Sequence, residues 1–165
     1  LVDDTLAAVA HARTLPGVDP ARVGLYGVSL GGTAAIGAAV RDGDVRAVAS
    51  IAAFSSWQGV AGDTLPLVGR LVVGPGVDAE RLVTELGDRP LFVAHGTGDR
   101  IVPSYHADRI AAAARGAGVD VDRRIFDGAG HNDWPVTHPQ MCAAIAAFFV
   151  DRLDAAAGSS RSPRP

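Results

Sequence analysis

The sequence predicts an α/β fold, with a mostly parallel sheet and helices on both faces of that sheet. Short apolar runs alternate along the chain with segments whose apolar residues recur at helical spacing. The apolar runs are continuous and do not alternate with polar residues, as in strands that are buried on both faces. Of the 165 residues, 48% are hydrophobic and 20% are charged, which suits one globular domain with an apolar core.

Four segments are expected to be strands, because each is a short apolar run next to a turn signal. In chain order they are 21–28 (ARVGLYGV), 45–54 (VRAVASIAAF), 90–96 (PLFVAHG) and 121–128 (VDRRIFDG). Helix-like segments separate the strands, so the strands are expected to run parallel.

Four longer helices are expected between and around these strands. They cover residues 3–13, 30–43, 104–118 and 138–153. The first has an acidic start and is stopped by the sequence LPGVDP, and the second is closed by Gly43.

The chain is expected to divide into a partial catalytic domain over residues 1–154 and a polar, proline-bearing disordered tail over 155–165. Residues 55–88 are longer than a plain crossover, and two readings are open: a small lid, or a long crossover with one helix. Several apolar residues could line a substrate pocket or pack the lid onto the sheet: Trp57, Leu65, Leu67, Val68, Leu71 and Trp134.

The charge pattern excludes several classes of partner. Acidic and basic residues are mixed along the chain, with a net charge of −3, so nucleic acid is not expected to bind.

No cysteine and histidine cluster has zinc spacing, and no apolar run reaches the roughly 18 residues of a membrane span. We expect a cytoplasmic protein without metal or cofactor that acts on a small-molecule ester or a short peptide, and the sequence leaves its oligomeric state open.

The pattern G-x-S-x-G occurs once, as Gly27-Val28-Ser29-Leu30-Gly31. In a nucleophile elbow this pattern places a serine on a strained turn between a strand and a helix, with glycines where a side chain would collide with neighbouring backbone. A strand is expected before this run and a helix after it, which favours Ser29 as a nucleophile over a glycine-rich turn without chemistry. The backbone N–H of Leu30 would be an oxyanion donor at the helix start.

A serine nucleophile needs a base and an acid that orients the base. Asp99 follows the third expected strand in HGTGDRIVP, and His131 follows the fourth in GAGHNDWP. An ordinary turn aspartate and a solvated loop histidine are the alternatives. The rivals are less suitable: Ser50, Ser55, Ser56 and Ser104 lack the glycine bracket, His11, His106 and His138 are expected to face solvent or cap a turn, His95 is expected to be structural, and Asp127 and Asp133 lie too close to His131.

The motifs PGVDPARVGLYGVSLGG, HGTGDRIVP and GAGHND together resemble the α/β-hydrolase family. They are most similar to the branch with dienelactone hydrolases, prolyl-oligopeptidase-type catalytic domains and BEM46-like hydrolases. The resemblance implies Ser29 as nucleophile, His131 as general base and then acid, and Asp99 as the residue that orients His131. It implies no cofactor.

The implied function is a serine hydrolase that cleaves a carboxylic ester through an acyl-enzyme. A serine peptidase of the prolyl-oligopeptidase type and a non-catalytic binding relative are the alternatives. The family's sheet normally has eight strands, and this chain supplies the later ones. The loop that gives the second oxyanion donor follows an early strand, so we expect a α/β-hydrolase fold without its N-terminal strands and weak activity of the chain alone.

Overall fold

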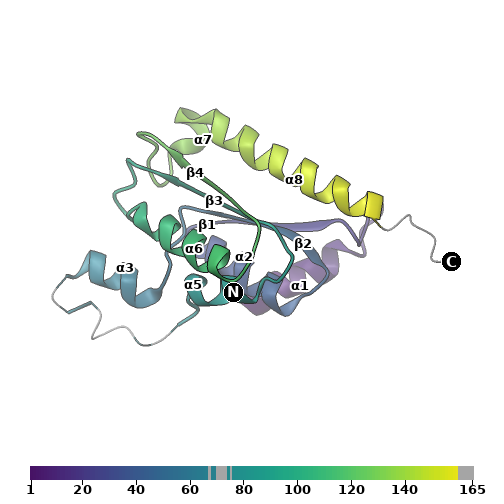
Figure 1. The fold of residues 1–165 in the computed structure, drawn as a ribbon, viewed down its shortest axis with the longest axis horizontal. Coiled ribbons are helices and arrows are strands. Elements are labelled where there is room, and N and C mark those ends of the chain that lie inside the picture. The colour runs from purple at the N-terminus through teal and green to yellow at the C-terminus, as the bar shows by residue number, and fades with distance from the viewer. Residues whose placement is uncertain (67, 70–73, 75, 160–165) are drawn as a thin grey trace.

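The computed structural model describes residues 1–66, 68–69, 74 and 76–159. Four strands form one sheet in the order β1-β2-β3-β4, and every neighbouring pair is parallel (Figure 1). Their bounds are Val23–Val28 for β1, Val45–Ile51 for β2, Leu91–Gly96 for β3 and Val121–Phe126 for β4. The four expected strands and their parallel arrangement are confirmed.

The helices of the described residues lie between and around the strands. Their bounds are Val2–Ala12 for α1, Leu30–Arg41 for α2, Trp57–Thr64 for α3, Ala79–Leu82 for α5, Tyr105–Gly116 for α6, Trp134–Thr137 for α7 and Pro139–Ser159 for α8, with a 3-10 helix over Val83–Glu85. The four expected longer helices correspond to α1, α2, α6 and α8.

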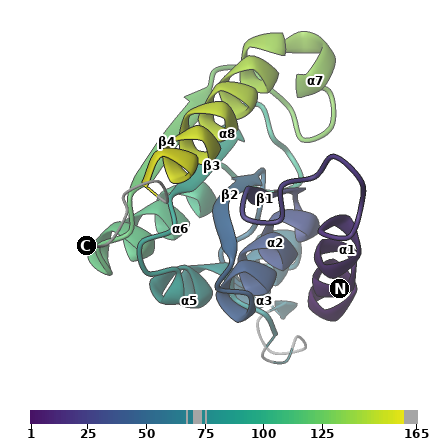
Figure 2. The same ribbon diagram turned by 90° about the vertical axis from the view of Figure 1, so that its right-hand side faces the viewer.

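Both faces of the sheet carry an apolar layer. On one face α2, α5 and α6 pack on the strands, with Ile36, Val48 and Ile110 among the fully buried residues. On the other face α8 packs on β2 and β3, and Phe92 and Phe148 lie there with ring centroids 5.4 Å apart. Figure 2 shows α1 beside α2 and α8 across the sheet from them.

The parallel order brings the carboxyl ends of all four strands to one edge of the sheet. Ile51 of β2 is in register with Val28 of β1 and with Ala94 of β3. The loops that follow β1, β3 and β4 therefore leave the sheet at the same edge, where α3 and α7 also lie (Figure 1).

β1 is an edge strand of the described sheet, because it stands first in the sheet order and pairs on one side, with β2. Tyr26, in the middle of β1, is 49% exposed. Tyr26 also borders an apolar groove of about 310 Å³ that continues along α8 and includes Trp134 and Phe149.

Residues 55–88 contain more structure than a crossover with one helix. The described part holds α3, α5 and the 3-10 helix over Val83–Glu85, so the single-helix alternative is wrong. The lid reading stays a prediction. Leu67 and Leu71 lie outside the described residues.

The tail prediction is wrong for its first five residues, because α8 continues to Ser159. Three of those residues are the alanines 155–157, and alanine has the highest intrinsic helix propensity. The helix therefore extends beyond the last apolar turn on which the sequence pattern depended. Residues 160–165 lie outside the described part.

Candidate active site

Ser29 lies on the turn between β1 and α2 and has a strained backbone. Its φ is 54° and its ψ is −123°, a conformation that residues other than glycine rarely adopt. Its backbone N–H donates to the carbonyl oxygen of Ile51 at 2.8 Å, which continues the ladder between β1 and β2. Such a backbone costs about 1–3 kcal/mol and persists where the flanking elements enforce it. The strand and helix required by a nucleophile elbow are both present.

The glycines around Ser29 have different roles. A Cβ at Gly27 would overlap the backbone of Gly31, so position 27 needs glycine. A Cβ at Gly32 would lie 2.7 Å from Ser50 Oγ, so position 32 is also crowded, which the sequence pattern did not indicate. The collision expected at Gly31 is wrong, because a Cβ there would meet nothing within 4 Å.

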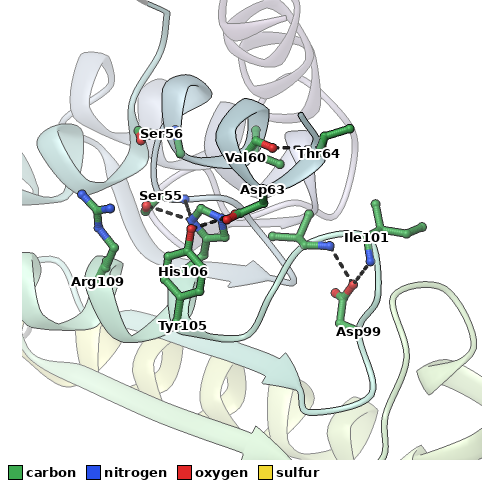
Figure 3. Close-up of polar contacts among 12 residues, drawn as sticks. Ser55, Ser56, Val60, Asp63, Thr64, Asp99, Ile101, Tyr105, His106 and Arg109 are labelled. Atoms are coloured by element: carbon green, nitrogen blue, oxygen red, sulfur yellow. Dashed lines mark hydrogen bonds and ion pairs between the residues drawn. The ribbon is translucent and has the colours of Figure 1, made fainter. Parts of the chain in front are cut away.

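Asp99 and His131 are in direct contact. His131 Nδ1 lies 2.7 Å from Asp99 Oδ2, and both side chains are buried. The carboxylate can only accept here, so Nδ1 carries the proton and Nε2 is left as the basic nitrogen. The other oxygen, Asp99 Oδ1, accepts the backbone N–H groups of Ile101 and Val102 at 2.9 Å each (Figure 3).

These hydrogen bonds decide the charge of Asp99. Burial acts to raise the pKa of the carboxyl and is the largest single influence. The hydrogen bonds from His131 and from the two backbone N–H groups act together in the opposite direction, and the pKa of Asp99 is lowered overall. Asp99 is therefore a carboxylate at neutral pH.

The loops that carry Asp99 and His131 pack backbone against backbone. A Cβ at Gly96 would overlap the carbonyl group of Ala129, and a Cβ at Gly98 would approach the carbonyl oxygen of Gly128. The two glycines of HGTGD therefore allow the loops to meet.

Asp133 holds the loop that carries His131 by a hydrogen bond to its backbone. Its Oδ1 accepts the N–H of Gly130 at 2.9 Å, immediately before His131. Asp127 instead accepts a hydrogen bond from the hydroxyl of Thr97 at 2.8 Å, across the two loops.

Ser29 lies at the same edge of the sheet as the Asp99–His131 pair, since it follows the carboxyl end of β1. Its hydroxyl makes no hydrogen bond within the described residues. The structure therefore joins two of the three predicted residues by a hydrogen bond, and the third, unbonded, follows β1, which β2 separates from β3.

Leu30 begins α2, and the first N–H groups of a helix have no acceptor inside the helix. Its position therefore suits an oxyanion donor. A small cavity of about 70 Å³ lies beside it, lined by Leu30, Thr33, Trp57 and Val77 among others.

The apolar residues expected to form one pocket do not gather in one place. Trp57 lines the cavity at Leu30, whereas Trp134 lines the groove along α8. Leu65 and Val68 are 52% and 50% exposed.

His106 was expected to face solvent, and this is wrong, because its side chain is fully buried. Its Nε2 donates to Asp63 Oδ2 at 2.8 Å, and its Nδ1 accepts the N–H of Ser55 at 3.0 Å (Figure 3). Ser55 Oγ lies 2.9 Å from the same Nδ1. The ring nitrogens bond to residues 43 and 51 positions away in the sequence and not to water. The spacing of residues within one helix gives no information on such distant partners.

The remaining alternative serines and histidines have other surroundings. Ser50 Oγ is buried without a hydrogen bond in the described structure, and Ser56 caps α3 by accepting the N–H of Gly59. His138 bonds the carbonyl oxygen of Asp127 at 2.9 Å, and His11 is exposed. No group of three or more metal-ligating side chains occurs among the described residues. Within the same part of the chain, no helix is long and apolar enough to span a membrane.

Comparisons with known proteins identify the family of this chain. The model of the dienelactone hydrolase family matches residues 1–133. The protein YfhR of Escherichia coli O157:H7 is 31% identical over 118 residues, which are 70% of this chain and 41% of YfhR. The chain thus spans less than half the length of this curated relative.

Solved structures show the same fold. An acylaminoacyl peptidase of Pyrococcus horikoshii superposes with a TM-score of 0.78 at 19% identity, over 93% of this chain and 28% of the peptidase. The Pyrococcus furiosus esterase Pf2001 superposes with a TM-score of 0.74 at 15% identity, over 92% of this chain and 61% of the esterase. Since the family model covers residues 1–133 and these structures share the fold, the chain belongs to the dienelactone hydrolase family and has the α/β-hydrolase fold.

Proposed function

We propose that this chain carries the catalytic machinery of a serine hydrolase that cleaves carboxylic esters through an acyl-enzyme. Ser29 is the nucleophile, His131 the base and then the acid, and Asp99 the residue that orients His131. The observation that carries the proposal is the 2.7 Å contact between His131 Nδ1 and Asp99 Oδ2 at the sheet edge where Ser29 has its strained backbone.

The chemistry follows from the tautomer that Asp99 imposes. His131 Nε2 accepts the proton of the Ser29 hydroxyl as the oxygen attacks the ester carbonyl carbon. The tetrahedral intermediate collapses, the bond to the alcohol oxygen breaks, and His131 returns the proton to the leaving alcohol. Water then attacks the acyl-enzyme with the same base, which releases the acid and regenerates the Ser29 hydroxyl.

The negative charge of the intermediate is stabilised at the start of α2. The N–H of Leu30 and the positive end of the helix dipole favour charge on the former carbonyl oxygen. In the hydrolases that this chain resembles, a second N–H comes from a loop after an early strand. One such donor typically contributes about 10²–10³ to turnover.

An ester is favoured over a peptide by the family to which the chain belongs, whose name describes hydrolysis of a lactone, a cyclic ester. The structural similarity to an acylaminoacyl peptidase concerns the fold. A p-nitrophenyl acetate assay and an alanine p-nitroanilide assay on the same preparation separate the two substrate classes, and we expect turnover of the ester only.

Labelling by a fluorophosphonate probe tests the nucleophile without depending on substrate choice. The wild-type chain should be labelled, and Ser29→Ala should abolish both labelling and ester hydrolysis. Ser104→Ala is the matched control, because Ser104 precedes α6 near Asp99 and its side chain makes no capping hydrogen bond. Labelling that persists in Ser29→Ala would remove Ser29 from the mechanism.

A further inference from the structure

A second histidine contacts the carboxylate of Asp99. His95 lies near the end of β3 and is fully buried. Its Nε2 lies 3.1 Å from Asp99 Oδ2 and 2.9 Å from the carbonyl oxygen of Val102. Both partners accept, so Nε2 carries the proton and donates to them. Asp99 Oδ2 thus receives N–H groups from two histidines, His131 and His95.

The other ring nitrogen of His95, Nδ1, carries no proton, so the ring is neutral. His95 Nδ1 is buried and has no hydrogen-bond partner in the described part of the chain. A second proton there would have no acceptor, and burial is the largest of the influences that lower the pKa of His95. The titratable groups that act on His95 are Asp99, which favours the charged ring, and His106, which disfavours it. His95 therefore remains a neutral donor.

We infer that His95 is a positioning residue for the acid of the catalytic triad: its Nε2–H fixes Asp99 Oδ2 for the hydrogen bond with His131 and draws charge from that oxygen. The kinetic part of this inference rests on the proposed function, whereas the geometry of the two histidines does not.

The carboxylate of Asp99 has four donors, two on each oxygen. Without the His95 donor, Oδ2 would have one fixed partner in place of two, and the carboxylate would be held less firmly in its orientation towards His131. Its charge would also act more strongly on His131 and favour the protonated ring. Removal of the donor should therefore slow turnover and move the acidic limb of the pH profile of kcat to higher pH.

Two substitutions separate the donor from the volume of the ring. His95→Met fills a similar space without a donor, and His95→Gln keeps an N–H near the position of Nε2. We expect His95→Met to lower kcat about tenfold with little change in KM, and to raise the midpoint of the acidic limb by about half a unit to one unit. We expect His95→Gln to restore most of both.

His106→Met is the control for loss of a buried histidine, because His106 is equally buried but bonds Asp63 and Ser55. It should leave the midpoint of the acidic limb where it is. A folded His95→Met protein with wild-type kcat and pH profile would overturn the inference. So would a midpoint shift of the same size in His106→Met, which would indicate a general effect of lost packing.

Nitrogen NMR of the histidine rings tests the inference without turnover. In the wild-type chain His95 should show a protonated Nε2 and an unprotonated Nδ1 over the pH range of the kinetic assay. A His95 ring protonated on Nδ1 would overturn the inference even where the variants fail to fold. If the wild-type chain hydrolyses no ester but the NMR result is as expected, the proposed function fails and the positioning of Asp99 stands.

Discussion

Gly27 and Gly31 flank Ser29 symmetrically in the sequence, yet their surroundings differ. A Cβ at position 27 would overlap the backbone of Gly31, and backbone cannot move aside without distorting the turn. Position 31 is exposed and open, and it lies in the first turn of α2. The spacing of the motif therefore identifies both glycines, but only contacts show which one the turn requires.

We expect Gly27→Ala to destabilise the chain severely, by about 3 kcal/mol or more, because it combines overpacking with a strained turn. Gly31→Ala should leave the free energy of unfolding unchanged or raise it by up to about 1 kcal/mol, because alanine has the higher helix propensity. Urea unfolding of the two variants measures the difference. Equal losses of stability would mean that the overlap at Gly27 is relieved by a small shift of the turn.

The sequence predicts the candidate triad residues but not the contacts of the buried histidines. Ser29, Asp99 and His131 each lie in the loop that follows a strand, so local patterns predict them as candidates. The contacts of His95 with Asp99 and of His106 with Asp63 depend on how separate segments meet in space. A histidine in a strand or helix pattern gives no local sign of such partners.

Among the elements, α3 is bound near both of its ends by the imidazole of His106, at the start of α6. His106 contacts Ser55 just before α3 and Asp63 near the end of α3 (Figure 3). The hydroxyl of Tyr105 also donates to Asp63 Oδ2, at 2.7 Å. Both ends of α3 are therefore bound to the start of α6, which follows the loop that carries Asp99.

Asp63→Ala should loosen α3, because it leaves the buried Nε2–H of His106 without its acceptor. We expect a loss of about 1–3 kcal/mol in the free energy of unfolding and faster hydrogen exchange of the α3 amides. Mass spectrometry of exchanged peptides measures the second effect. Asp63→Asn keeps an acceptor oxygen and should have the smaller effect.

Thr64→Ala is the matched control for this experiment. Thr64 Oγ1 donates to the carbonyl oxygen of Val60 inside the same helix and is exposed. Its loss should leave the exchange of α3 close to that of the wild-type chain. If Thr64→Ala accelerates exchange as much as Asp63→Ala does, the bonds to α6 do not hold α3 in place.

For the whole molecule, the sequence predicts the layered architecture well because each layer has a local signature. Continuous apolar strands and amphipathic helices specify which faces are buried, and the alternation of the two specifies parallel strands. The bounds near residues 55–88 and 155–159 depend on contacts and on helix propensity beyond the apolar pattern, and there the prediction is weaker.

Burial of uncharged histidines makes the stability of the whole molecule depend on pH. Burial is the largest of the influences that lower the pKa of His95 and of His106. Below about pH 6.5 the unfolded chain therefore binds protons that the folded chain does not, so acid favours unfolding. The pKa of Asp99 is also lowered, so its contribution is lost at still lower pH, as the folded carboxyl becomes protonated.

We expect the free energy of unfolding to fall as the pH is lowered from 7 to 5, with a slope of up to about 1.4 kcal/mol per pH unit for each histidine. Urea unfolding at a series of pH values measures that slope. His106→Gln removes one titrating ring while keeping a donor for Asp63, so its slope should be shallower than that of the wild-type chain. A wild-type free energy that is constant over this range, or that rises towards acid, would mean that the two rings are protonated in the folded chain. His95 Nδ1 would then carry a proton, and His106 Nδ1 could not accept the N–H of Ser55.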